Sequence, residues 1–85
     1  MTEGLMVRHR PIYAIAADIR KDWKRPYFGA VPYLQAMDSI DQIDQMYGAD
    51  TAVSVVLYFL ANAQTWRGEV ARRIKAELKA ITKGR

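Results

Sequence analysis

Four basic side chains near the C-terminus are the residues whose spacing most clearly suggests a chemical role. They recur every three or four residues along an expected helix, and they are Arg72, Lys75, Lys79 and Lys83. Lys and Arg on successive helical turns can follow the phosphates of a nucleic-acid backbone. The same pattern is typical of a solvated helix face, and cations also favour a helix C-terminus. Nucleic-acid binding is therefore one function that the sequence leaves open.

Two residues just before these four suggest protein binding instead. Trp66 and Arg67 stand together near the expected start of the last helix. Both residue types are common among the side chains that contribute most to protein interfaces. The alternative is that Trp66 belongs to the core and Arg67 is merely solvated. Together with the four basic residues, this pair makes up the candidate binding surface.

No combination of residues predicts catalysis. The chain has no cysteine and one histidine, His9, so the common zinc arrangements cannot form and neither serine has a histidine in register. Three carboxylates recur every third residue, at Asp38, Asp41 and Asp44. They could hold a divalent cation, but the solvated face of a short helix explains them better. We expect no enzyme activity, no metal, no cofactor and no small-molecule substrate.

Charge is distributed unevenly along the chain. The net charge of +4 divides into +3 for residues 1–25, −4 for residues 26–66 and +5 for residues 67–85. The middle segment contains no Lys or Arg. A small domain with separate acidic and basic regions is suited to a charged partner or to self-association. The expected partners are thus a protein, a second copy of the chain, or a nucleic acid.

Length and composition indicate one domain with a packed core. There are 85 residues, of which 51% are hydrophobic, too many for a disordered segment. The absence of cysteine favours a reducing compartment. Residues 1–10 contain no apolar run typical of a secretion signal, and the longest apolar stretch, residues 55–61, is far shorter than the roughly 20 residues that span a bilayer. We expect a cytoplasmic protein without a membrane segment.

Hydrophobic periodicity predicts an all-α bundle of about five helices, two of them short. The expected helices cover residues 11–24, a short segment from about residue 30, and residues 40–47, 51–64 and 66–83. Ser39 and Gln42 form a capping-box pattern before the third helix, Gly48 suits the left-handed end of that helix, and Asp50 is the expected cap of the fourth. Residues 1–9 would form a flexible arm and residues 10–85 a single domain.

The fourth helix is expected at the centre of the bundle. It is apolar on nearly every side, which is typical of a helix that others surround. Its β-branched residues 53–56 could instead form a strand. Helix is favoured, because no partner strand is evident and residues 60–63 continue the helical pattern.

Several segments resemble small proteins encoded by actinobacterial phages and mobile elements. The resemblance covers about residues 10–80 and is carried by residues 10–13, 19–23, 36–37, 46–48, 57–63, 65–69 and 71–78. It implies a bacterial host cytoplasm and an accessory or regulatory role, and it assigns no function to any residue. The sequence thus predicts a non-catalytic phage accessory protein that binds a host or phage protein. The alternative is an accessory protein that binds nucleic acid through the basic helix.

Overall fold

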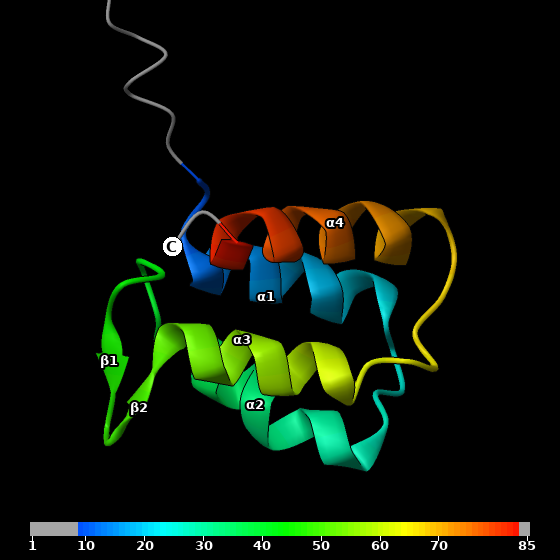
Figure 1. Cartoon of the computed structure of the whole chain (residues 1–85). Helices are drawn as coiled ribbons and strands as arrows, with labels where there is room; N and C mark the ends of the chain where they lie inside the picture. Colours follow the sequence, from blue (N-terminus) through cyan, green and yellow to red (C-terminus); the bar gives the residue numbers. More distant parts are fainter. Residues whose placement is uncertain (1–8, 84–85) are drawn as a thin grey trace, which may run out of the picture.

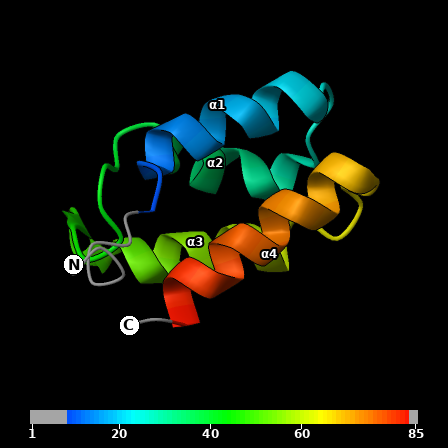
Figure 2. The same cartoon turned by 90° about the horizontal axis from the view of Figure 1, so that it is seen from above.

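Four helices form a closed ring in the computed structural model, which describes residues 9–83 (Figures 1 and 2). Each helix packs on the next along the chain, and the last closes onto the first. One layer holds the first and last helices, and the other holds the middle two. The helices are α1 (Ile12–Asp22), α2 (Val31–Met37), α3 (Ala52–Ala61) and α4 (Glu69–Lys83).

Two smaller elements complete the fold. A short 3-10 turn, η2 (Phe28–Ala30), leads directly into α2. A hairpin of two short antiparallel strands, β1 (Met46–Tyr47) and β2 (Asp50–Thr51), precedes α3. The fold is therefore mostly helical, but it is not strictly all-α and it has four α-helices rather than five.

The hairpin replaces the helix that was expected over residues 40–47. A helix there would need the carbonyl groups of Ile40 and Asp41 for its own first turn. Instead, these carbonyls accept the backbone N–H groups of Tyr13 and Ile12, at 2.8 and 2.9 Å. Pro11, which precedes α1, offers no side-chain cap, so the distant segment satisfies the unpaired donors at the start of that helix. The hydrophobic periodicity of residues 40–47 gives no indication that α1 competes for these two carbonyls.

The expected capping box is also wrong. Gln45, rather than Ser39, organises this segment: its Oε1 accepts the N–H groups of Asp41 and Gln42, and its Nε2 donates to the Ser39 carbonyl. Gly48 does adopt the predicted left-handed conformation, with φ of 61°. It does so in the turn of the hairpin, where a positive φ is typical, and not at a helix end.

Helix α3 is confirmed as a helix, and its β-branched residues do not form a strand. Its cap is Thr51, whose Oγ1 accepts the Ser54 N–H at 3.0 Å, and not Asp50. The prediction that it is buried on all sides is wrong. One face is buried, through Ala52, Val55, Val56 and Phe59. On the other face, Leu57 and Tyr58 are about half exposed.

The first and last helices are close to their predicted positions. Helix α1 ends at Asp22, ahead of Pro26. Helix α4 begins at Glu69, three residues later than expected, after Gly68 with φ of 113°. Each buries one stripe of apolar residues. No helix in the described part of the chain has the length and apolarity needed to cross a membrane. The predicted flexible arm falls almost entirely on residues 1–8, outside the described range.

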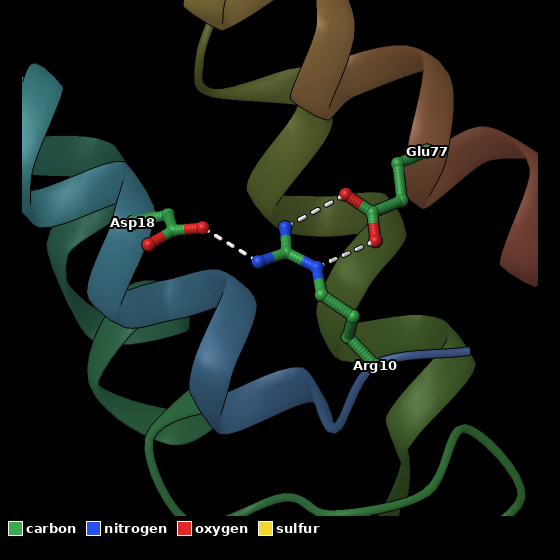
Figure 3. Close-up of polar contacts among 3 residues, drawn as sticks. All are labelled: Arg10, Asp18 and Glu77. Carbon is green, nitrogen blue, oxygen red and sulfur yellow. Dashed lines mark hydrogen bonds and ion pairs between the residues drawn. The ribbon is translucent and has the colours of Figure 1, made fainter. Parts of the chain in front are cut away.

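Arg10 joins three parts of the chain at one corner of the bundle (Figure 3). Its guanidinium makes two parallel hydrogen bonds with Glu77 of α4, at 2.8 and 2.9 Å, and a third with Asp18 of α1 at 2.6 Å. Bidentate pairs of this kind are the stronger form of ion pair. Glu69 and Glu77 both lie four residues from Arg73 on α4, but Glu77 pairs with Arg10 and Glu69 with Arg72.

This cluster predicts an acid-sensitive contribution to stability. The hydrogen bond from Arg10 lowers the pKa of the Asp18 carboxyl below its usual value of 3.8. The ion pair between Arg10 and Asp18 therefore stabilises the fold fully above about pH 4, and this contribution disappears as the pH falls through the lowered pKa. Both side chains are partly exposed, so Asp18→Asn should cost at most about 1 kcal/mol at pH 7.

The difference in unfolding free energy between Asp18→Asn and the parent should shrink progressively as the pH falls below about 4, as measured by urea unfolding at each pH. An unchanged difference at the lower pH would mean that the Asp18 charge does not contribute.

Candidate functional surfaces

The basic ridge, defined as Arg72, Lys75, Lys79 and Lys83, lies along α4 as the sequence predicted. Two of its members have partners within the domain. Arg72 pairs with Glu69, and the Lys75 ammonium donates to the Trp66 carbonyl at 2.6 Å. Lys79 and Lys83 are exposed. The ridge is thus not a uniform row of solvated cations.

Lys75 is the most perturbed member of the ridge. Its side chain is partly buried and its ammonium lies 5.8 Å from the centre of the Trp66 ring. Burial lowers the pKa of the Lys75 ammonium, and the positive charges of Lys79 and Arg67 lower it further. Lys75 therefore lies within electrostatic reach of both Lys79 and Arg67.

Trp66 belongs to the core and is not a surface anchor. Only 2% of the residue is exposed. Its ring stacks on Trp23 with centroids 5.6 Å apart and meets Phe59 edge-on at 6.4 Å. Its Nε1 donates to the Asp22 carboxylate at 2.8 Å, which satisfies its only side-chain donor. Of the two alternatives for the adjacent pair, the structure supports a core Trp66 beside an exposed Arg67.

A second surface, formed by η2, α2 and α3, was not among the predicted sites. We define the uncharged face as the aromatic and aliphatic side chains on the outer side of this layer, namely Tyr27, Phe28, Tyr33, Leu57 and Tyr58. Residues 27–37 and 51–66, which build the layer, include no Asp, Glu, Lys or Arg. Phe28 is 79% exposed, and Tyr58 is 52% exposed.

Contacts between these side chains form two aromatic pairs on the face. The rings of Tyr33 and Tyr58 lie 5.5 Å apart and bridge α2 to α3. The rings of Tyr27 and Phe28 lie 4.8 Å apart on η2. Tyr27 also lines a shallow hollow with residues from the end of α3 and the loop after it. A side chain on Gly29 would collide with Tyr27 and Asn62, so glycine allows η2 to lie against α3.

Sequence reasoning missed this face for a specific reason. The helix over residues 51–64 was expected to be surrounded by the other helices. Aromatic residues at helical spacing are more often core than surface, and a chain of this size needs their bulk. The signal that could have identified the face is the lack of charge across both segments. A fully enclosed layer and an interface layer share that signal, and only the packing distinguishes them.

The described residues contain no arrangement suited to catalysis by a metal. Among them, no group of three His, Cys, Asp or Glu side chains lies close enough to hold an ion. Asp38 pairs with Arg20 at 2.6 Å, and Asp41 accepts a hydrogen bond from Gln42 at 3.0 Å. These contacts are those of a solvated acidic surface.

Comparison of the chain with protein-family models, with curated proteins and with solved structures finds no match.

Proposed function

We propose that this chain is a non-catalytic protein-binding module and that the uncharged face is its binding surface. The observation that carries the proposal is the exposure of four large aromatic and aliphatic side chains, with the partly buried Tyr33 beside them, on a layer without a single charge. Contiguous exposed apolar surface on a small protein commonly marks an interaction site. Trp66 no longer contributes to the proposed surface, because it is buried.

The composition of the face fits the centre of a protein interface. Such centres are enriched in Tyr and Phe and depleted of charged residues. Covering the face removes apolar area from water at roughly 25 cal/mol per Å², and no ion must lose its hydration. The tyrosine hydroxyls remain available for hydrogen bonds with a partner. A polyanion such as a nucleic acid would find no cation here to neutralise its phosphates.

Nucleic-acid binding is the second candidate, and one observation favours it. Arg67, Lys75 and Lys79 lie close enough for the first and last to lower the pKa of the Lys75 ammonium. A phosphate placed there would relieve this repulsion. The candidate ranks second because Arg72 and Lys75 already have partners within the domain.

We also propose a biological setting for the chain. The resemblance to proteins of actinobacterial phages and mobile elements implies an accessory or regulatory role in the cytoplasm of an infected or lysogenic bacterium. We therefore propose a host or phage protein, or the chain itself, as the partner, and an actinobacterial lysate as the natural source of binding partners for a test.

Affinity capture from such a lysate, supplemented with untagged chain, tests both candidates. The tagged parent is compared with Tyr58→Glu on the uncharged face and with Lys79→Glu on the basic ridge, and both positions are exposed. We expect nuclease-resistant protein capture that falls at least tenfold in Tyr58→Glu and persists in Lys79→Glu.

Capture that disappears with nuclease and with Lys79→Glu would instead favour nucleic-acid binding. Thermal melts of each variant serve as the control for folding. Protein capture that is equal for the parent and for Tyr58→Glu would contradict the proposed surface.

A further inference from the structure

We infer that the uncharged face binds a second copy of this chain, with the two α3 helices antiparallel across a two-fold axis. This inference rests on the proposed function and identifies the partner. In a two-fold dimer the same surface patch of each copy meets its own counterpart. A charged patch would therefore repel itself. The uncharged face avoids this repulsion even though the chain as a whole carries a net charge of +4.

The two ends of the α2–α3 layer carry opposite charge, and this polarity sets the orientation. At one end lie the hairpin and the segment leading into it, with exposed carboxylates at Asp41, Asp44 and Asp50. At the other end lie the turn between α1 and η2 and the loop between α3 and α4 (Figure 1). These two connections carry the exposed cations Lys24, Arg25 and Arg67.

An antiparallel pair places the acidic end of each copy beside the basic end of the other. A parallel pair would place like charges together at both ends, where they repel. The dipole of α3 acts in the same direction, because antiparallel helices align opposite partial charges. The apolar centre thus supplies attraction, and the ends select the orientation.

The dimensions of the face predict a weak dimer. Helix α3 has 10 residues and α2 has 7, so they extend about 15 and 10 Å respectively. An interface of this length lies at the low end of the range for specific complexes, below about 1,200 Å² in total. We therefore expect a dissociation constant in the micromolar range, roughly 10 to 100 μM, with a monomer at high dilution.

Analytical ultracentrifugation from about 5 to 500 μM tests dimerisation. The parent should convert from monomer to dimer across this range. Tyr58→Glu and Phe28→Glu, at two exposed positions on different elements, should each raise the dissociation constant at least tenfold, and Lys79→Glu should change it less than twofold. Two separate face variants guard against a folding defect in either one.

Cross-linking tests the orientation, because the natural chain has no cysteine to interfere. Asp50→Cys and Thr65→Cys place one thiol at the acidic end and one at the basic end of α3, both at exposed positions. Oxidising an equimolar mixture above the dissociation constant should give mainly the mixed disulfide. Each variant oxidised alone should give little dimer. Predominant Asp50→Cys self-linkage would overturn the antiparallel arrangement.

The outcomes separate this inference from the proposed function. A chain that remains monomeric at 500 μM, while Tyr58→Glu still abolishes capture of another protein, overturns the dimer and leaves the proposed function intact. A chain whose self-association and protein capture are both indifferent to Tyr58→Glu overturns both. Concentration-dependent dimerisation that is lost in both face variants, with the mixed disulfide, supports both.

Discussion

Replacing Phe59 by alanine is expected to cause one of the two largest losses of stability among the single changes considered for this chain. The ring is fully buried and meets Trp23 and Trp66 edge-on, at 6.2 and 6.4 Å between centroids. Truncating a buried phenylalanine typically costs about 3 to 5 kcal/mol in the free energy of unfolding. Domains of this size have only about 5 to 15 kcal/mol in total, so the variant should be largely unfolded at elevated temperature.

The matched control for Phe59→Ala is Leu57→Ala, two residues earlier on the same helix. Leu57 is 48% exposed, so its truncation should change the free energy of unfolding by about 0.5 kcal/mol or less. Chemical denaturation followed by far-ultraviolet circular dichroism measures both changes under identical conditions. Similar midpoints for the two variants would mean that α3 does not pack with Phe59 facing the core.

Trp66→Ala is also expected to cause a large loss of stability. The size of this loss shows whether Trp66 is a core residue or a surface anchor. The change removes stacking on Trp23, the contact with Phe59 and the bond to Asp22, and should cost about 3 to 5 kcal/mol. Trp66→Phe keeps most of the apolar volume and loses the hydrogen bond to a carboxylate, so it should cost about 1.5 to 3 kcal/mol.

Thermal and urea unfolding of the two Trp66 variants give this order directly. If Trp66 were instead a surface anchor, Trp66→Ala would retain the melting temperature of the parent while weakening partner capture. That result would contradict the core position of the ring and reinstate Trp66 in the binding surface.

Strongly periodic segments of this sequence fold as predicted, because their structure is specified locally. Helices α1 and α4 each place apolar residues every three or four positions, and both bury the resulting apolar stripe. Gly48 also adopts the expected left-handed conformation, although it lies in the turn of a hairpin and not at a helix end. In these places propensity, periodicity and tertiary packing favour the same structure.

Elsewhere the outcome depends on residues far apart in the chain. Residues 40–47 have a helical pattern, yet α1 takes two of the carbonyls that a helix would need. Arg10 gives no local signal and is positioned by Asp18 and Glu77, which lie far from it in the sequence or on another element. For α3, sequence alone could not decide whether an apolar outer side faces other helices or solvent. The predicted basic ridge is present. Helical spacing predicts which side chains share a face, but it could not predict that Lys75 would donate to the Trp66 carbonyl.

The backbone bonds from Ile12 and Tyr13 to residues 41 and 40 also constrain how the domain can open. Because these amides have their acceptors in the segment that leads to the hairpin, that segment cannot detach without leaving donors at the start of α1 unpaired. Detachment would also separate Ala52, whose N–H donates to the Gln45 carbonyl, from the same segment. The hairpin side of the bundle and the start of α1 therefore open as one cooperative unit. The short hairpin is thus held closed by hydrogen bonds between segments that are far apart in the sequence.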